Sequence, residues 1–165
     1  MLHLQIMRFN PKSKGRWKWL LIVGVPVVAI LVVGKMTNTN PPTNLAQTTP
    51  DEAPELRTRL YRQTPDEVLQ AAKTVAGEQK TWFKLWRISP QSEVTSGPPH
   101  HQLKVEVPVL FYTDDLTVSL DTVDGQTRVN VKSKSRVGQG DFGENRRHVA
   151  QFLAALDRQL GMDSS

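Results

Sequence analysis

The stretch "LTVSLDTVDGQTRVNVKSKSRV", residues 116–137, decides the fold of this protein. It holds two runs in which apolar and polar side chains alternate, the pattern of strands with one buried face. Asp124 and Gly125 stand between the runs, and this pair is typical of a two-residue hairpin turn. The turn sets Val118 opposite Val131, so the apolar side chains share one face. The turn and the hydrophobic pattern therefore predict the same antiparallel register.

The other face of this hairpin is charged. The same register sets Asp121 opposite Arg128 and Asp115 opposite Lys134, and opposite charges attract across neighbouring strands. Lys132 adds to a basic stripe along the second strand. We expect this face to be solvated, with part of its positive charge balanced by the acidic residues.

The segments around the hairpin extend it to an α+β domain. They predict strands at 56–62, 82–88 and 103–112 and helices at 65–77 and 141–161. The strand at 103–112 precedes the hairpin directly, which makes a C-terminal three-strand meander. Both helical segments carry one apolar stripe. We therefore expect a two-layer domain over residues 56–161, with about five antiparallel strands and two helices on one face of the sheet.

The most apolar segment of the chain is "WKWLLIVGVPVVAILVVGKM", residues 17–36. As a helix it is about 30 Å long at ~1.5 Å per residue, which matches the hydrocarbon core of a bilayer. Residues 1–16 carry bases and no acid, so the positive-inside rule predicts a basic cytoplasmic tail. We therefore expect a single-pass anchor in an inner or thylakoid membrane, with the domain on the extracytoplasmic side. The alternative is a signal peptide cleaved after Gly34.

Residues 37–55 separate the predicted anchor from the predicted domain. They are rich in Thr, Asn and Pro and have little to bury, so we expect a disordered linker.

The excess of basic residues belongs to the N-terminal segment. The chain has 21 Lys and Arg against 16 Asp and Glu, and residues 1–36 hold six of the bases and none of the acids. The basic isoelectric point is therefore no sign of a nucleic-acid partner. The chain has no cysteine, which excludes disulfides, thiolate catalysis and cysteine-ligated metals. We expect no cofactor and no resident metal.

Gly138, Gly140 and Gly143 have the spacing G-x-G-x-x-G of a dinucleotide-binding turn. That site needs a second parallel strand after the helix, and the helix at 141–161 is the last predicted element. We therefore interpret the glycines as turn residues. Asp141 and the glutamate three positions later have the spacing of a capping box, which indicates a helix start.

Two segments carry a family resemblance: "LFYTDDLTVSL", residues 110–120, and "KSKSRVGQGDFGENRRHVAQFL", residues 132–153. They resemble the domain of unknown function 1499 family of bacteria and photosynthetic eukaryotes, over about residues 56–160. The matching positions are Asp114, Asp115, Ser135, Arg136, Gly138, Asp141, Gly143, Asn145, Arg146 and Arg147. The chain departs from many members in lacking a cysteine before the domain. The resemblance implies a fold and brings no activity.

Asp114, Asp115 and Asp141 are the candidate carboxylates. Paired carboxylates suit a metal ion or acid–base chemistry, so a small hydrolase is one hypothesis. The alternative, which we favour, is that they pair with Lys134 or Arg136 and hold the strand end in place.

Arg136, Asn145, Arg146 and Arg147 are the candidate anion-binding residues. Guanidinium groups near a helix N-terminus suit a phosphate or a lipid head group. The alternative is a buried Arg–Asp network at the junction of strand and helix.

Three further features bear on function. Trp82 and Trp86 share a face of the predicted strand 82–88, where they form either core or the lining of an apolar pocket. His148 is expected on the helix surface. His100 and His101, neighbours on a predicted loop, have poor spacing for a metal site.

The leading hypothesis is a non-enzymatic binding or assembly module that is tethered to a membrane through residues 17–36. Its partner would be a membrane protein or an anionic lipid head group. A hydrolase and a carrier of an apolar or lipid ligand are the alternatives, and the oligomeric state stays open.

Overall fold

The computed structural model describes residues 44–94, 101–137, 141 and 143–162. The predicted tail, the anchor at 17–36 and the first part of the linker lie outside the described residues, as do Gly138 and Gly140. Within the described ranges, no helix combines the length and the apolar character that a membrane span requires.

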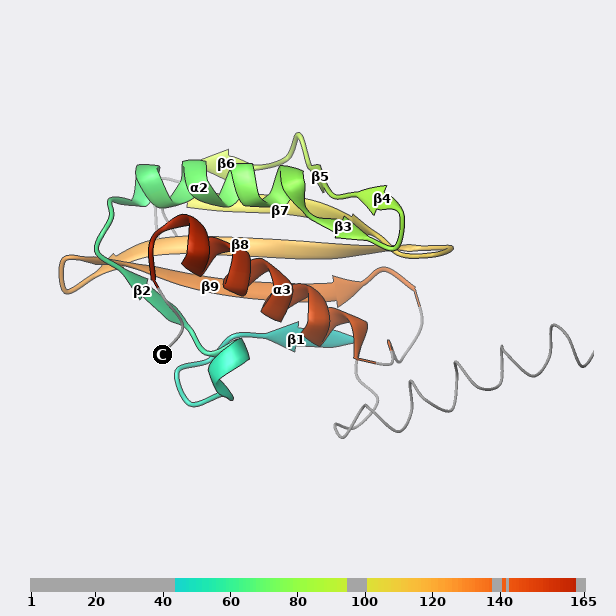
Figure 1. Cartoon of the computed structure of the whole chain (residues 1–165), viewed down its shortest axis with the longest axis horizontal. Coiled ribbons are helices and arrows are strands. Elements are labelled where there is room, and N and C mark those ends of the chain that lie inside the picture. The colour runs from blue at the N-terminus through green and yellow to red at the C-terminus, as the bar shows by residue number, and fades with distance from the viewer. Residues whose placement is uncertain (1–43, 95–100, 138–140, 142, 163–165) are drawn as a thin grey trace, which may run out of the picture. The chain divides into compact units, whose positions relative to one another are not determined.

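Seven strands of the described residues form one antiparallel sheet (Figure 1). The centre is the predicted meander: β7 (His101–Pro108), β8 (Thr113–Val123) and β9 (Gln126–Ser135). Short strands pair with its edges: β1 (Leu45–Gln47) and β2 (Arg59–Tyr61) with β9, β5 (Arg87–Ile88) and β6 (Glu93–Val94) with β7. The sheet thus has more strands than the five or so predicted, and the additional ones are two or three residues long.

The predicted register of the β8–β9 hairpin is confirmed. Val118 lies opposite Val131, and Asp121 lies opposite Arg128. The φ angles of Asp124 and Gly125 are 51° and 74°, so both turn residues are left-handed. Such a turn matches the twist of the two strands it joins, which is why a short sequence signal was enough to set the register.

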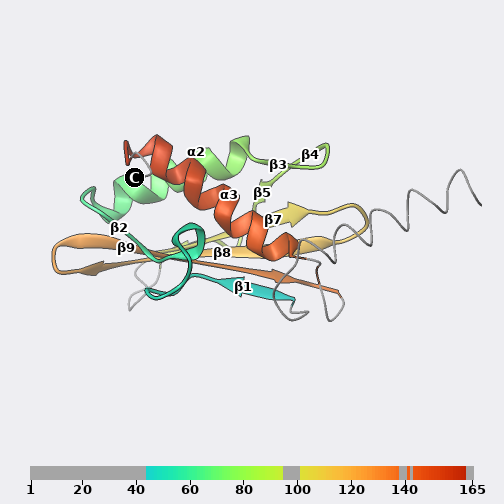
Figure 2. The same cartoon turned by 60° about the horizontal axis from the view of Figure 1, so that its bottom comes forward.

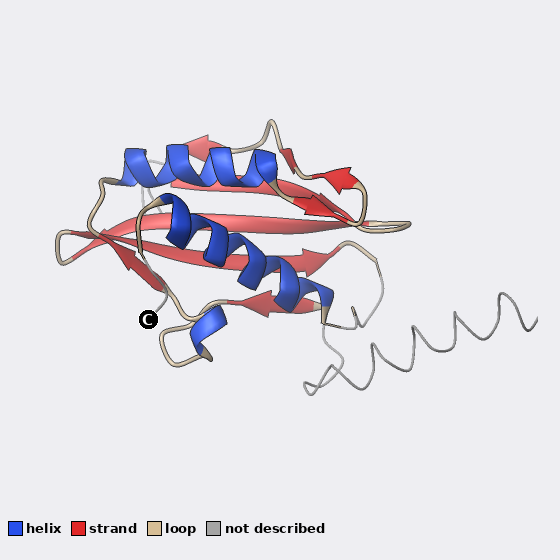
Figure 3. Ribbon diagram, viewed as in Figure 1, coloured by secondary structure: helices blue, strands red, loops and turns tan. Residues whose placement is uncertain are grey.

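Two helices, α2 (Pro65–Glu78) and α3 (Glu144–Gln159), cover one face of the sheet (Figures 2 and 3). The capping box at the start of α2 is present: Thr64 and Glu67 bond to each other's backbone N–H. The end of α2 differs from the prediction, because Gly77 lies inside the helix and the N–H of Gln79 still donates to the carbonyl of Val75.

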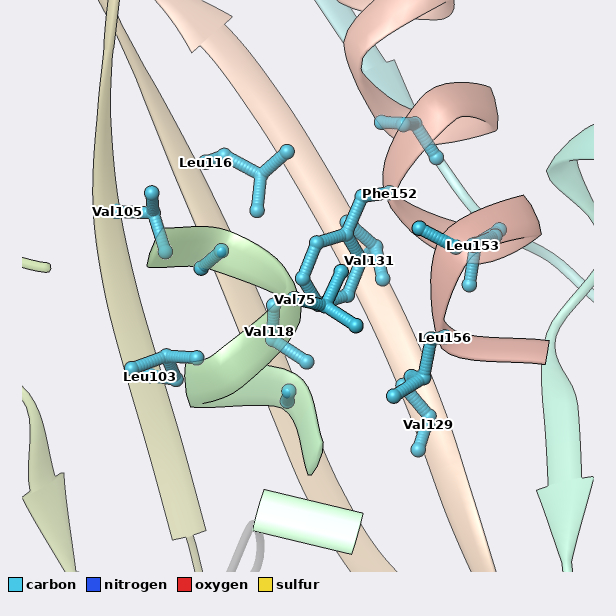
Figure 4. Close-up of a cluster of buried hydrophobic side chains, with 14 of the residues drawn as sticks. Val75, Leu103, Val105, Leu116, Val118, Val129, Val131, Phe152, Leu153 and Leu156 are labelled. Atoms are coloured by element: carbon cyan, nitrogen blue, oxygen red, sulfur yellow. The ribbon is translucent and has the colours of Figure 1, made fainter. Parts of the chain in front are cut away.

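Apolar side chains from both layers fill the space between the sheet and the helices (Figure 4). The sheet contributes alternate residues of β7, β8 and β9, and α2 and α3 contribute their apolar stripes. The labelled members are Val75, Leu103, Val105, Leu116, Val118, Val129, Val131, Phe152, Leu153 and Leu156. This filled core leaves the opposite face of the sheet free of any helix among the described residues.

The predicted strand at 82–88 is wrong. The chain instead forms a small hairpin of β3 (Lys80–Thr81) and β4 (Lys84–Leu85) before β5. Trp82 and Phe83 are its two turn residues, and their exposed fractions are 53% and 95%. Trp86 is buried, and its Nε1–H donates to the hydroxyl of Thr81 at 2.7 Å. A turn made of aromatic residues carries none of the usual Gly, Asn or Pro signals.

The described part of the linker is not disordered. Residues 44–55 hold β1 and lead into a 3-10 turn, Pro54–Leu56, whose Leu56 is buried. The N–H of Ser135 donates to the carbonyl of Asn44 at 3.0 Å, so the segment pairs with the edge of β9 through its backbone. Backbone pairing needs no apolar side chains, and composition therefore gave no sign of it.

Candidate functional site

The face of the sheet opposite the helices is polar and hollowed. We call it the open face: the outward residues of β7, β8 and β9 with the end of β1. A hollow of about 730 Å³ lies on it. Polar residues dominate its lining: Gln47, Thr48, Gln102, Lys104, Asp115, Thr117, Ser119, Asn130, Lys132, Lys134 and Arg136. The alternation of side chains along each strand separates this polar set from the core.

Some charges of the open face are paired. Arg128 donates to Asp121 at 2.9 Å, as the register predicted. Arg136 donates to Asp115 at 2.6 Å and to Glu106 at 2.7 Å. These hydrogen bonds raise the pKa of Arg136, first through Asp115 and then through Glu106, so this guanidinium stays charged.

Three lysines of the open face are not balanced in this way. In the portion of the chain that the structure describes, no carboxylate lies within ion-pair distance of Lys104, Lys132 or Lys134. Asp115 lies opposite Lys134, as predicted, but its carboxylate bonds to Arg136 instead. The hollow therefore presents three lysines without a carboxylate partner, beside an arginine that holds two carboxylates.

The four candidate anion-binding residues do not form one site. Arg136 lies on the open face, whereas Asn145, Arg146 and Arg147 belong to α3 on the other side of the sheet. Arg146 pairs with a glutamate, Glu55, and Arg147 pairs with a glutamate of its own helix.

Asn145 is buried and has a structural role. Its Oδ1 accepts from the hydroxyl of Ser133 at 2.6 Å, and its Nδ2 donates to Ser135 and to the carbonyl of Asn44, each at 3.0 Å. This amide ties α3 to β9 and to Asn44, the residue before β1. The alternative prediction, a buried Arg–Asp network at this junction, is also wrong: an amide and serine hydroxyls hold the junction, and Arg146 and Arg147 pair with glutamates.

The three candidate carboxylates are also separated. Asp114 is fully buried beneath α3, and its neighbour Asp115 lies on the open face, because successive residues of a strand point to opposite sides. Asp141 accepts from the N–H groups of Gly143 and Asn145, both at 2.9 Å, and so starts α3. Within the described ranges, no group of three His, Asp or Glu side chains has the arrangement of a metal site.

The start of α3 differs from the predicted capping box. Gly143 is the N-cap residue with φ of 82°, a left-handed conformation that glycine adopts without strain. Asp141 caps the helix from two residues further back. The side chain of Glu144 does not reach back to Asp141 but contacts Arg147 and His148.

His148 is the residue that the sequence interpretation missed, because it is buried and not on the helix surface. Its Nδ1 lies 3.3 Å from Asp114 and its Nε2 lies 3.6 Å from Glu144. The ring meets Trp86 edge-on, with centroids 5.8 Å apart. The one available signal was its position four residues before Phe152, on the apolar stripe of the helix.

This buried cluster is a tie between α3 and β8. Asp114 is 0% exposed and His148 is 1% exposed, so neither can touch a substrate. The cluster also reaches Tyr112, whose pKa is raised by burial and by the nearby carboxylates, Asp114 first. We find no catalytic arrangement in it.

The comparisons with known proteins give a family and no activity. A model of the family described as "Protein of unknown function (DUF1499)" matches residues 35–156. The match begins before the domain start that the sequence predicted and includes β1. No curated protein matches the chain.

Two solved structures are similar to the chain. CalU16 from Micromonospora echinospora is 15% identical, with a TM-score of 0.41, and the match covers 72% of this chain and 82% of that one. TTHA0849 from Thermus thermophilus is 11% identical, with a TM-score of 0.34, and the match covers 73% and 99%.

Proposed function

This chain belongs to the DUF1499 family of proteins of unknown function, and from its geometry we propose that it is a binding module whose open face holds an acidic segment of a protein partner. The observation that carries the proposal is the set of three lysines on the hollow, Lys104, Lys132 and Lys134, which have no carboxylate partner among the described residues.

The form of the open face supports a partner and not a small substrate. The lining of the hollow combines charged, amide and hydroxyl side chains from several strands. Uncompensated lysines attract carboxylates over a Debye length of about 8 Å at physiological salt, which speeds encounter with an acidic segment. The neighbouring Arg136 already holds two carboxylates of the chain itself, which supports carboxylates as the ligand groups of this surface.

The predicted anchor indicates where in the cell this binding would occur. With residues 17–36 in a bilayer, the domain would meet partners on the extracytoplasmic side of that membrane. A module that holds a partner beside a membrane acts in assembly or retention.

The alternatives have less support. A hydrolase using Asp114, Asp115 and Asp141 would need these carboxylates around one substrate, and they lie on different sides of the sheet. A carrier would need an apolar cavity between the layers, where the core side chains pack.

A charge-reversal experiment tests the proposal. The full chain in mild detergent is titrated with a fluorescent poly-glutamate peptide at low salt, and binding is followed by anisotropy. We expect that Lys132→Glu with Lys134→Glu weakens binding by about tenfold or more, equivalent to ~1.4 kcal/mol. Raising the salt concentration should weaken wild-type binding in the same direction.

The matched control is Lys73→Glu, which makes the same charge change on α2, away from the open face. Its binding should stay near that of the wild type. Equal binding by the wild type and the double variant would contradict the proposal. So would an equal loss for Lys73→Glu, because the attraction would then depend on net charge alone. Binding of anionic lipid vesicles, but not of the peptide, through the same lysines would instead indicate a lipid ligand.

A further inference from the structure

Two hairpins at one end of the sheet carry apolar side chains at their tips. Trp82 and Phe83 are the turn residues between β3 and β4, and Leu110 and Phe111 lie between β7 and β8. Phe83 is 95% exposed and Phe111 is 91% exposed. We call these four residues, three aromatic residues and Leu110, the aromatic tips.

The register shows that the tips share one end of the sheet. β8 begins opposite Pro108 at the end of β7, next to the turn with Phe111. β5 starts with Arg87 opposite Glu106, so the β3–β4 hairpin that precedes it lies near the same end. Figure 1 shows both turns on the right, where β1 also begins.

Folding of the domain does not explain these side chains. Turn positions favour Gly, Asn and Asp, and the β8–β9 turn at the other end follows this rule with Asp124 and Gly125. Trp82 adopts a φ of 57°, a left-handed conformation that costs a bulky residue about 1–2 kcal/mol. Exposed aromatic rings gain nothing from water. An apolar environment outside the domain would bury these rings and so explain why they are present.

The predicted membrane anchor would place such an apolar environment, the bilayer, near the domain. Seven residues, 37–43, separate the predicted anchor at 17–36 from Asn44. Even fully extended, they span only about 23 Å at ~3.3 Å per residue. Asn44 accepts from the N–H of Ser135 at 3.0 Å, beside the β7–β8 turn end of the sheet. If residues 17–36 span a bilayer, this short tether limits how far this end of the sheet can lie from the bilayer surface.

The charges around the tips suit the same environment. Lys80 and Lys84 flank the Trp82–Phe83 turn, and both are exposed. In the part of the chain that the structure describes, neither forms an ion pair. Tryptophan and phenylalanine with flanking lysines are typical of the interface of a membrane that contains anionic lipids.

We propose that the aromatic tips insert into the interface of an anionic bilayer and dock the domain, end-on, against the membrane that holds its anchor. The strands then run toward the bilayer. The open face is then perpendicular to the membrane plane, and it faces the side of a neighbouring membrane protein.

The absence of cysteine from the sequence makes a direct test available. The full chain is reconstituted in vesicles with and without phosphatidylglycerol, and Phe83→Cys is labelled with an environment-sensitive fluorophore. We expect strong quenching by bromine-bearing lipids and weak quenching by aqueous iodide. A label at Thr122→Cys, exposed at the other end of β8, should show the reverse, with a difference of several-fold.

A second pair of variants separates docking from simple tethering. With the label at position 83, Trp82→Ser with Phe111→Ser should return the fluorophore to water. Leu60→Ser, which removes an exposed apolar residue from β2, should leave it in lipid. Lys80→Ala with Lys84→Ala should weaken lipid quenching in the anionic vesicles only.

Three results would overturn the proposal. One is equal iodide quenching of the labels at 83 and 122. Another is lipid quenching at 83 that survives the serine substitutions, since the label and the tether alone would then account for it. The third is lipid quenching that is the same with and without phosphatidylglycerol. Circular dichroism of each variant checks that the domain is folded.

Discussion

The two ends of the sheet are built in different ways. At one end, the β8–β9 turn is Asp124–Gly125, and the carboxylate of Asp157 accepts from Tyr61 at 2.7 Å and from Arg59 at 3.1 Å. We call this the Gly125 end. At the other end, the turns carry the aromatic tips, and the buried Asp114 and His148 lie 3.3 Å apart without a well-aligned hydrogen bond.

The two ends differ in how much their features contribute to the stability of the fold. Three features of the Gly125 end lower the free energy of the folded domain: a relaxed turn, a satisfied tyrosine hydroxyl and a paired carboxylate. The end with the aromatic tips keeps exposed rings and a strained Trp82, which folding alone does not favour. The contrast is the one expected if the tips serve a contact outside the domain, as proposed above, and substitutions at each end can test this.

The largest expected effect compares the two buried carboxylates. Asp157→Ala leaves Tyr61 and Arg59 without their acceptor, so we expect the free energy of unfolding to fall by about 3 kcal/mol. Asp114→Asn keeps the shape and loses no well-aligned hydrogen bond, so a loss of about 1 kcal/mol is expected. Urea denaturation measures both, with the exposed Asp51→Asn as the neutral control. Equal losses at 157 and 114 would remove the contrast between the ends.

The second effect compares the tips of the hairpins. Gly125→Ala places a Cβ at φ of 74°, and since no atom lies within 4 Å of that Cβ, the cost is conformational, about 1 kcal/mol. Phe83→Ser and Phe111→Ser remove exposed rings, so each should change the free energy of unfolding by less than about 0.5 kcal/mol. A larger loss at either phenylalanine would mean that the ring stabilises the domain itself.

A smaller effect of opposite sign is expected at Trp82. Asparagine tolerates a positive φ better than tryptophan, so Trp82→Asn should raise the free energy of unfolding by a few tenths of a kcal/mol, roughly. Urea denaturation of the detergent-solubilised chain measures the change, with Lys84→Asn on the adjacent strand as the control. Destabilisation by Trp82→Asn would show that the indole packs favourably and that the turn is not strained.

The smallest effect concerns pH at the Gly125 end, where α2 begins. The backbone N–H and the hydroxyl of Thr64 lower the pKa of Glu67 below its ordinary 4.5. Because the folded pKa is the lower one, the contribution to stability is complete above pH 4.5 and is lost as the pH falls through the folded pKa. The stability difference between the wild type and Glu67→Gln should therefore shrink as the pH falls below 4.5. A difference that is constant with pH would contradict this linkage.

Part of the candidate site was predictable because it depends on local rules. The open face follows from the alternation along β8 and β9, and the Asp121–Arg128 pair follows from the turn. The division of Asp114 from Asp115 also follows from strand geometry. The pairing of Arg136 was not predictable in detail, because Glu106 reaches it from β7 while Lys134 stays unpaired.

The sequence by itself determined the antiparallel meander, the two amphipathic helices and the start of α2. These depend on periodicity, turn chemistry and capping, which act over a few residues. Only the tertiary structure decided that residues 45–47 join the edge of β9, that Trp82 and Phe83 form a turn, and that His148 is buried against Asp114. Each of these depends on which surface a distant segment offers, and a free strand edge or a gap beside a helix exists only once the chain has folded.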